Sequence, residues 1–381
     1  MKFFGQNLLQ KRKIRAPKPV HQWKIQPKHP ELFIPDPKLF PKSSFFRFQP
    51  QTKPQTQSMK ELQAERLLIG RNDIQTALLI KELEAQKLAF VYIDWDELSF
   101  QGEFTTGSGD KAALKIGRNW LDLSNVKKLF ITIPYIDAAL EETQALSLSE
   151  KVQLKRWMSV FYNLSSMMPR RAIFYPCTPN LIGNRAQNRI SDRKLAQSLG
   201  FKIPEFICTN DSKALQIFFK KMNSCILFRE IDNQISHQEH IRSFQMQKVT
   251  SLTQISKKQL MHSPCYFEEY IEKAFEVRAY VIGNQVLACR IDSQASDKAK
   301  SDWREYDFDH VRFGEMKLPS QISARLKKFA KMREMKFASF DLIFSVNQEV
   351  HFLEMNRPGA WGFIEALSGV GITRALARLM K

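Results

Sequence analysis

Apolar and polar positions alternate in two ways along the first half of the chain. Short apolar runs of strand length recur at 67–69, 90–93, 128–135 and 171–175. Residues 72–87 and 149–166 instead place apolar side chains at helical spacing, and Asn72 or Asp73 can cap the first of these helices. Strands that alternate with helices predict a parallel α/β sheet.

The second half of the chain is richer in strands. Helical spacing predicts helices at 188–199, 212–222 and 373–380, and Gly200 follows the first of them, where glycine commonly ends a helix. Apolar runs predict strands at 226–229, 266–271, 277–282 and 285–292. The polar loop 232–247 contains no glycine. This part therefore favours an α+β arrangement.

A β-hairpin is predicted near the C-terminus. The apolar runs 337–346 and 349–356 flank the polar pair 347–348, which is the length of a tight hairpin loop. A two-residue loop pairs Val346 with Glu349, and this register continues back along both arms.

The predicted register places two acids face to face. Asp341 lies directly opposite Glu354, and Asn356 faces the same side as Glu354 because side chains alternate along a strand. Opposed carboxylates repel each other unless a cation lies between them. Two carboxylates and an amide oxygen suit Mg²⁺ that arrives with a nucleotide phosphate. The alternative is a solvated strand pair with ordinary surface acids, which the apolar flanking residues disfavour.

The first 57 residues differ in composition from the rest. They contain nine of the 17 prolines and 12 Lys or Arg residues against Glu31 and Asp36. Proline at this density interrupts helices and strands. We therefore expect a basic, Pro-rich and mostly irregular extension, which either binds an anionic partner or only aids solubility.

Charge and cysteine content indicate the kind of partner and the cellular location. The net charge of +19 favours an anionic partner, such as nucleic acid, an acidic membrane surface or an acidic peptide. No apolar stretch is long enough for a transmembrane helix, and the N-terminus lacks the apolar segment of a signal peptide. Five scattered cysteines without metal-ligand spacing are typical of reduced thiols, so we expect a cytoplasmic protein.

Several motifs surround the predicted acid pair. They are FEEYI at 267–271, FEVR at 275–278, ACRIDSQ at 288–294, SDWR at 301–304 and FLEMNRPGAWG at 352–362. Together these motifs resemble the ATP-grasp superfamily, over about residues 185–381. The specific likeness is to the ligases that macrocyclise microviridin-type peptides (graspetide synthetases), which are relatives of the glutamate-adding ligases.

The resemblance implies a domain organisation. An ATP-grasp fold would follow an N-terminal parallel α/β domain and the basic Pro-rich extension. The expected parts are the extension 1–57, the α/β domain 58–180, a small ATP-grasp subdomain 181–262 and a C-terminal subdomain 263–381 that carries the Mg-ATP site. The resemblance also suggests a homodimer.

The same resemblance implies a two-step reaction. ATP phosphorylates a carboxylate, and a nucleophile then displaces the phosphate from the acyl phosphate. Asp341, Glu354 and Asn356 would be the Mg²⁺ ligands. Arg278 and Arg304 would hold the γ-phosphate and the acyl phosphate, because a guanidinium binds phosphate with two parallel hydrogen bonds and stays charged.

The nucleotide pocket is implied by further positions. The segment Glu268, Glu269, Tyr270 and Ile271 would be the hinge that reads adenine. Two lysines that reach nucleotide phosphates in the family are replaced by arginines, and these are Arg189 and Arg229. Arginine and lysine are not interchangeable at a tight site. Because both positions keep their positive charge, we interpret the pocket as altered but working.

Three functions follow from these observations. The leading hypothesis is an ATP-dependent carboxylate ligase that forms an ester or amide bond on an acidic peptide or protein, as in RiPP biosynthesis. The second is a small-molecule or glutamate ligase of the same fold. The third is a non-catalytic ATP-grasp-like protein that binds nucleotide or nucleic acid, which the two arginines and the glycine-free loop favour.

Overall fold

The structure is a computed structural model of the chain. It describes residues 61–62, 64–71, 73–106, 112–116, 119–132, 147–177, 189–229, 247–255, 260–261, 263–297, 299–300, 303, 309–356 and 360–381. They belong to one compact unit that begins at Pro54. The expected extension 1–57 and most of the loop 232–247 lie outside the described residues.

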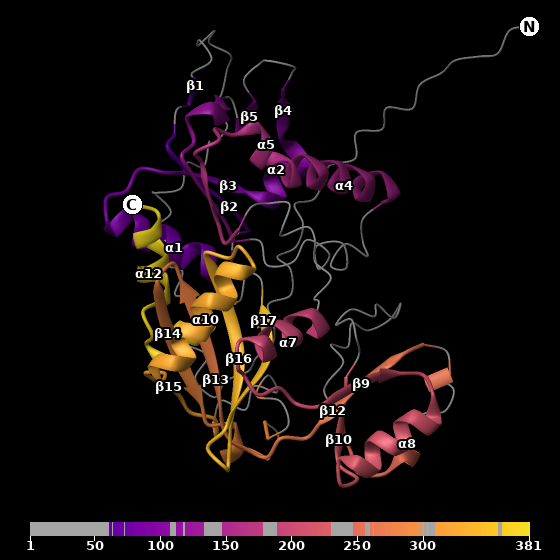
Figure 1. The fold of residues 1–381 in the computed structure, drawn as a ribbon. Coiled ribbons are helices and arrows are strands. Elements are labelled where there is room, and N and C mark those ends of the chain that lie inside the picture. Colours follow the sequence, from indigo (N-terminus) through magenta and orange to yellow (C-terminus); the bar gives the residue numbers. More distant parts are fainter. Residues whose placement is uncertain are drawn as a thin grey trace, which may run out of the picture. The chain divides into compact units, whose positions relative to one another are not determined.

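The expected parallel sheet forms the centre of the first part of the chain (Figure 1). Its strands run in the order β3-β2-β7-β8 and all pair in parallel. Their bounds are β2 Arg66–Gly70, β3 Val91–Asp94, β7 Lys128–Ile131 and β8 Ile173–Tyr175. The middle of β2 and of β7 is fully buried and wholly apolar, as is usual for a parallel sheet covered on both faces.

The predicted helices of this part are present, with one correction. Helix α1, Ile74–Ala85, is capped by Asp73, whose carboxylate accepts from the Thr76 amide at 2.8 Å. The helix predicted at 149–166 is two helices, α4 (Leu148–Tyr162) and α5 (Leu164–Met167). The chain turns at Asn163 between them, and a capping box at Ser147 and Glu150 starts α4.

Shorter elements were missed by the sequence patterns. They are helix α2 (Trp95–Gln101) and a second sheet in the order β1-β6-β5-β4. The strands of that sheet are β1 Glu61–Leu62, β6 Asn119–Asp122, β5 Ala113–Ile116 and β4 Glu103–Thr105. A period of two needs more than two to four residues to be recognised, so these strands carry too little pattern.

A smaller antiparallel sheet follows, with the strand order β11-β10-β12-β9. Its strands are β9 Phe206–Thr209, β10 Ile226–Arg229, β11 Gln247–Val249 and β12 Cys265–Glu269, and helix α8 Ser212–Lys221 packs on it. Helix α7 Arg189–Ser198 precedes this sheet in the chain and contacts β17 of the large sheet described next. Gly200 follows α7 with φ +84°, as its position predicted. β12 lies beyond the boundary at residue 262 that we expected, yet it pairs with β9 and β10.

The largest sheet is antiparallel and has the order β15-β14-β13-β16-β17 (Figure 1). Its strands are β13 Lys273–Ile282, β14 Gln285–Ile291, β15 Phe313–Glu315, β16 Phe337–Ser345 and β17 Val350–Asn356. The helices of this part are α10 Ser320–Met332, α11 Gly362–Ser368 and α12 Ile372–Leu379. Only the last was predicted. Single 3-10 turns occur at Leu123–Asn125, Leu252–Gln254 and Ser293–Ala295.

The parallel sheet and the large antiparallel sheet share a core. One buried cluster contains Leu68 and Phe130 from the first sheet with Tyr280 and Phe337 from the second. The ring centroids of Phe130 and Phe337 lie 6.5 Å apart. Burial of aromatic rings from both sheets therefore ties them together. Within the described ranges, no helix is both long enough and apolar enough to cross a membrane.

The hairpin between β16 and β17 corrects the predicted register. Its loop has three residues, not two: the Ser345 amide donates to the Glu349 carbonyl at 2.9 Å, and Gln348 has a left-handed φ of +61°. Phe344 consequently pairs with Val350, one residue away from the prediction. A β-bulge beside Leu342 then restores the register, so Asp341 does lie opposite Glu354.

Candidate active site

Three charged side chains lie in one row across the large antiparallel sheet. Arg278 on β13 pairs with Asp341 on β16, and Asp341 pairs with Glu354 on β17. Residues directly opposite each other project to the same face, so their side chains are neighbours. We refer to Arg278, Asp341 and Glu354 as the charged row. All three are buried, with exposed fractions between 7% and 9%.

The centre of the charged row is a hydrogen-bonded ion pair. Arg278 Nη1 lies 3.2 Å from Asp341 Oδ1 and 3.4 Å from Oδ2. Asn356 donates Nδ2 to Asp341 Oδ2 at 3.1 Å, and Arg278 Nη2 donates to Ser339 Oγ at 3.4 Å. The three predicted metal ligands are therefore brought together, with Arg278 beside them.

Arg189 closes the other end of the row. It begins helix α7, and its Nη2 lies 3.2 Å from Glu354 Oε2. Its guanidinium also lies over the Tyr266 ring, 5.6 Å from the centroid. Arg189, a predicted nucleotide-binding residue, thus lies against the predicted metal ligand Glu354.

Arg193 is a site residue that the sequence analysis missed. Its side chain is fully buried, one helical turn after Arg189 on α7. Nη2 lies 2.7 Å from Glu268 Oε2, Nη1 donates to Tyr266 Oη at 2.8 Å, and Nε donates to the Leu353 carbonyl at 3.1 Å. This one guanidinium therefore joins α7, β12 and β17. The spacing of four residues from Arg189, which puts both arginines on one helix face, was the available signal.

The bulge explains why the Leu353 carbonyl can bind Arg193. The pairing with β16 passes from Glu354 to Phe352 and skips Leu353. The carbonyl of the skipped residue accepts the hydrogen bond from Arg193. The residue next to Glu354 is in this way held from α7.

The four predicted hinge residues have different surroundings. Glu268 is buried and bound by Arg193, whereas Glu269 accepts from the Glu205 amide at 3.1 Å through its carboxylate. The Tyr270 ring has the Lys248 ammonium 3.8 Å from its centroid. Ile271 packs in a small buried cluster with Ile343 and Leu353. Glu268 therefore contacts α7, and Ile271 contacts β16 and β17.

Two predicted residues receive no side-chain description. Arg304 lies outside the described residues, and Arg229 is described by its backbone alone, as the last residue of β10, where it pairs with Tyr266. Trp303, the neighbour of Arg304, is described. The Arg278 guanidinium lies over its ring at 5.6 Å from the centroid.

Burial and charge together set the protonation of the arginines. Burial alone lowers the pKa of Arg278, but the charge of Asp341, helped by Tyr280 and Glu354, outweighs it and raises that pKa above its ordinary value. The pKa of Arg193 is raised in the same way, with burial opposed chiefly by Glu268. Both guanidiniums therefore stay charged at any working pH.

The donor set fits Mg²⁺ shared with a phosphate. The charged row and Asn356 offer two carboxylates and one amide, all oxygen donors of the kind Mg²⁺ prefers. In the described part of the chain, no cluster of three or more His, Cys, Asp or Glu side chains could hold a metal by itself. A metal at this site would thus need further ligands from phosphate and water, as in ATP-dependent transferases.

Comparison with known proteins gives a sharp contrast between sequence and structure. No protein-family model matches the chain, and no curated protein matches it. Solved structures do match. A RiPP-associated ATP-grasp ligase from Chryseobacterium gregarium, in complex with ADP and a leader and core peptide, is 19% identical with a TM-score of 0.70. The match covers 83% of this chain and 96% of that one.

Two further structures agree. The macrocyclase MdnC from Microcystis aeruginosa MRC, bound with the precursor peptide MdnA, is 21% identical with a TM-score of 0.67 over 82% of this chain and 98% of that one. D-alanine–D-alanine ligase from Bacillus anthracis, complexed with ATP, is 13% identical with a TM-score of 0.50 over 84% and 96%. The chain therefore has an ATP-grasp fold with a parallel N-terminal sheet, which confirms the fold that the sequence resemblance implied.

Proposed function

We propose that the protein is an ATP-dependent carboxylate ligase that acts on an acidic peptide or protein and forms an ester or amide bond. The observation that carries the proposal is the charged row, in which two buried carboxylates oppose each other beside Arg278. Burial of charges is costly, and such groups concentrate at functional sites. The ATP-grasp fold supports ATP as the phosphoryl donor.

Asp341, Glu354 and Asn356 would hold Mg²⁺ in this site. Bound Mg²⁺ neutralises phosphate charge and favours transfer of the γ-phosphoryl group to a substrate carboxylate. The protein contributes position: Asp341 is fixed by Arg278 and Asn356, and Glu354 by Arg189. These ligands would therefore be oriented before nucleotide binds.

Arg278 would hold the transferred phosphate and the acyl phosphate that results. Its charge is secured by Asp341, and it is buried against the Trp303 ring, where a bound acyl phosphate would be shielded from water. We assign the same task to Arg304, which follows Trp303 in the sequence. A nucleophile of the substrate then displaces the phosphate and completes the ester or amide.

Arg189 and Arg229 would bind the nucleotide phosphates, and residues Glu268 to Ile271 would read adenine. Arg193 supports this assignment, because it bonds Glu268 while it also bonds Leu353 beside Glu354. In this proposal the parts 181–262 and 263–381 hold the nucleotide between them, and 58–180 carries substrate recognition.

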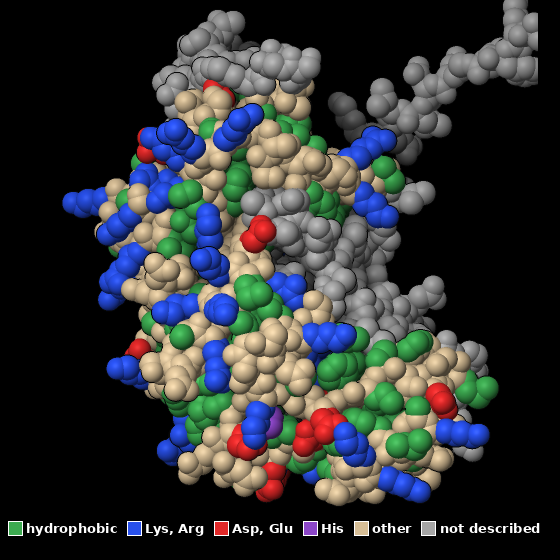
Figure 2. All heavy atoms as spheres, viewed as in Figure 1, with side chains coloured by type: hydrophobic (Ala, Val, Ile, Leu, Met, Phe, Trp, Pro, Cys, Tyr) green, Lys and Arg blue, Asp and Glu red, His purple; other side chains and the backbone are tan. Residues whose placement is uncertain are grey.

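An acidic peptide substrate is favoured by charge. The chain has a net charge of +19, and Figure 2 shows many more Lys and Arg than Asp and Glu side chains on the face in view. Such a surface speeds encounter with an acidic chain. Among the structures that match, MdnC is bound with a precursor peptide and the Chryseobacterium ligase with a leader and core peptide. We include RiPP biosynthesis, a homodimer and a cytoplasmic location in the proposal.

The experiment incubates the full chain with Mg-ATP and a library of Asp- and Glu-rich peptides. We expect ADP to form together with a peptide that has lost one water, detected by mass spectrometry. Glu315→Gln is the matched control, because Glu315 is an exposed acid at the opposite edge of the same sheet. ADP formation that is equal in wild type and in the double variant Asp341→Asn/Glu354→Gln would contradict the proposal.

One observation favours a second function. Glu354 is already paired with Arg189, so a guanidinium occupies one side of a predicted metal ligand. A non-catalytic nucleotide-binding protein could retain this arrangement. It would bind ATP equally with and without Mg²⁺ and would release no ADP with any peptide.

A further inference from the structure

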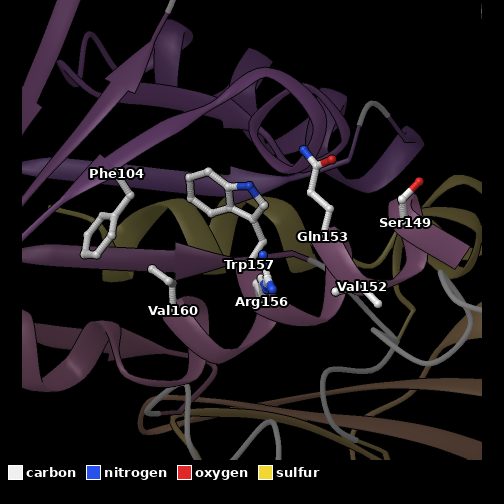
Figure 3. A pocket seen from close by; sticks show the side chains of 7 residues that line it. All are labelled: Phe104, Ser149, Val152, Gln153, Arg156, Trp157 and Val160. Atoms are coloured by element: carbon white, nitrogen blue, oxygen red, sulfur yellow. The ribbon is translucent and has the colours of Figure 1, made fainter. Parts of the chain in front are cut away.

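A groove runs along the outer side of helix α4. Its lining residues are Phe104, Ser149, Val152, Gln153, Arg156, Trp157 and Val160, and its volume is about 660 Å³ (Figure 3). All but Phe104 come from α4, and Phe104 comes from β4. None of them belongs to the charged row or its partners. We refer to it as the α4 groove.

The surface of the α4 groove is mainly apolar. Figure 3 shows Phe104 and Val160 toward one end, Ser149 toward the other and the indole of Trp157 between them. Val152 is 40% exposed, which makes it one of the few large hydrophobic side chains of the described residues that face water. Half-buried aromatic rings with an exposed aliphatic rim are the anchoring type of surface in protein interfaces.

The polar side chains of the groove leave one cation available. Gln153 is held in place, since its Nε2 donates to the Ser99 carbonyl at 3.1 Å. Arg156 is exposed and makes no hydrogen bond or ion pair with the described residues. Two nearby acids are not among the described residues that line the groove: Glu150 accepts a hydrogen bond from Ser147, and Glu103 lies 2.6 Å from Lys115. The described lining of the groove is therefore mainly apolar, and Arg156 is its one charged side chain.

The strand beside the groove can accept a partner. β4 stands at the end of its sheet in the order β1-β6-β5-β4 and pairs only with β5 among the described strands. A strand at the end of a sheet has backbone N–H and C=O groups that can pair with an added extended segment. Its central residue Phe104 lines the groove, so an added segment would lie near the apolar surface.

We propose that the α4 groove docks an acidic, extended segment of the peptide substrate. An apolar side chain of that segment packs against Trp157 and Phe104, and a carboxylate pairs with Arg156. Charge complementarity selects this occupant, because Arg156 is the one charged side chain in the described lining and the chain as a whole is strongly basic. The proposal rests on the proposed function only in naming the docked peptide as the substrate.

Docking away from the charged row has a kinetic consequence. A peptide anchored in the groove presents its reacting carboxylate at a high effective concentration, provided that the intervening segment can span the two sites. The groove therefore sets which peptides are accepted and leaves the chemistry to the charged row. A variant of the groove changes KM and leaves kcat unchanged.

The test measures binding of a short fluorescein-labelled peptide, in which Glu alternates with Val and Phe, to the full chain without ATP. We expect Trp157→Ala to weaken binding about 10-fold, because a central aromatic anchor is lost. Trp157→Phe retains most of the affinity. Arg171→Glu, a charge reversal at an exposed arginine outside the groove, is the matched control. Circular dichroism of each variant verifies that it is folded.

A charge exchange makes the test specific. Arg156→Glu should weaken the Glu-containing peptide about 10-fold at low salt, and a peptide with Lys in place of Glu should bind this variant better than wild type. Equal affinity of wild type, Trp157→Ala and Arg156→Glu for the acidic peptide overturns the proposal. So does sedimentation equilibrium in which wild type is a dimer, Trp157→Ala is a monomer and no peptide binds, because the occupant is then a second copy.

Repeating the binding measurement in Glu354→Gln separates this proposal from the proposed function. Binding that persists in Glu354→Gln supports the α4 groove whatever the chemistry. Binding to wild type without ADP formation from any peptide that binds contradicts the ligase and leaves the groove as a peptide site. ADP formation with equal peptide affinity in wild type and the groove variants supports the ligase and contradicts the α4 groove as a peptide site.

Discussion

The two central sheets of the protein differ in where their charged residues lie. In the parallel sheet, the middles of β2 and β7 are apolar and fully buried, and charged residues such as Arg66 and Lys128 lie at strand ends. In the large antiparallel sheet, Arg278, Asp341 and Glu354 lie well inside their strands and are buried as well. The first sheet buries apolar side chains at its centre, whereas the second accepts the cost of buried ions.

The difference shows where chemistry can be expected. A buried ion pair contributes little net stability compared with apolar residues of the same volume. Its retention in the middle of a sheet therefore indicates a task other than folding. The shared core of Leu68, Phe130, Tyr280 and Phe337 supplies the stability that the charged row does not.

The largest effect should come from removing the two carboxylate charges from the antiparallel sheet. Asp341→Asn with Glu354→Gln should lower ADP formation by about 10³-fold or more, because metal-ligand charges act mainly in the transition state. Calorimetry should also show that Mg-dependent nucleotide binding is lost. Glu315→Gln should behave as wild type. Mg-dependent binding retained in the double variant would show that these acids do not hold the metal.

The next largest effect should come from Arg193. Arg193→Met removes the guanidinium that lies 2.7 Å from the buried Glu268 carboxylate, so we expect the free energy of unfolding to fall by about 3–5 kcal/mol. Urea unfolding measures this change. Lys202→Met removes an exposed partner of Glu349 and should leave the free energy of unfolding almost unchanged, because solvent screens this pair.

A second substitution then separates stability from function at the same position. Arg193→Met/Glu268→Leu should recover most of the lost stability, because both charges are gone. Nucleotide binding should not recover with it, since the hinge acid and its link to Leu353 are absent. If nucleotide affinity returns together with stability, Arg193 serves folding only.

In the parallel sheet we expect the reverse outcome. Leu68→Ala opens a cavity in the shared core and should reduce the free energy of unfolding by about 3 kcal/mol. The dissociation constant of Mg-nucleotide, measured well below the unfolding transition, should stay unchanged. A large change in that constant would mean that the parallel sheet positions the charged row directly.

The smallest effect concerns pH. Burial lowers the pKa of His351, and Glu349 and Glu269 offset this only in part. Below the ordinary histidine pKa of about 6.5 the unfolded chain binds a proton that the folded chain resists, so stability falls as pH falls. The urea midpoint of wild type should therefore drop more between pH 7.5 and 5.5 than that of His351→Gln. An equal drop in both proteins would exclude His351 as the cause.

The sequence predicted the elements with a long, regular pattern and the acids that oppose each other. Asp341 and Glu354 face each other as expected, although the three-residue loop alone would have shifted them by one position. The bulge at Leu353 cancels that shift. A bulge leaves no mark in the apolar pattern. The predicted pairing of Asp341 with Glu354 is therefore right, although the predicted register near the turn is wrong.

Other features depend on tertiary contacts that no local pattern records. Arg193 looks in the sequence like a charge on a solvated helix face, and only the approach of β12 and β17 buries it. The α4 groove depends on Phe104 from a three-residue strand that was not predicted. Helix α10 was missed although its stripe of Ile322, Leu326 and Phe329 has helical spacing. That omission was avoidable.

The bulge at Leu353 has a practical use in protein engineering. The extra residue in β17 compensates for the one-residue shift that the three-residue loop causes. The pairing of Asp341 with Glu354 therefore does not follow from the loop length alone. Val346 is exposed at that tip, two residues before the left-handed Gln348. A peptide tag or a fluorescent label inserted after Asn347 would thus lengthen the hairpin tip without moving Asp341 against Glu354. The tip offers an attachment point on the same two strands that carry the site.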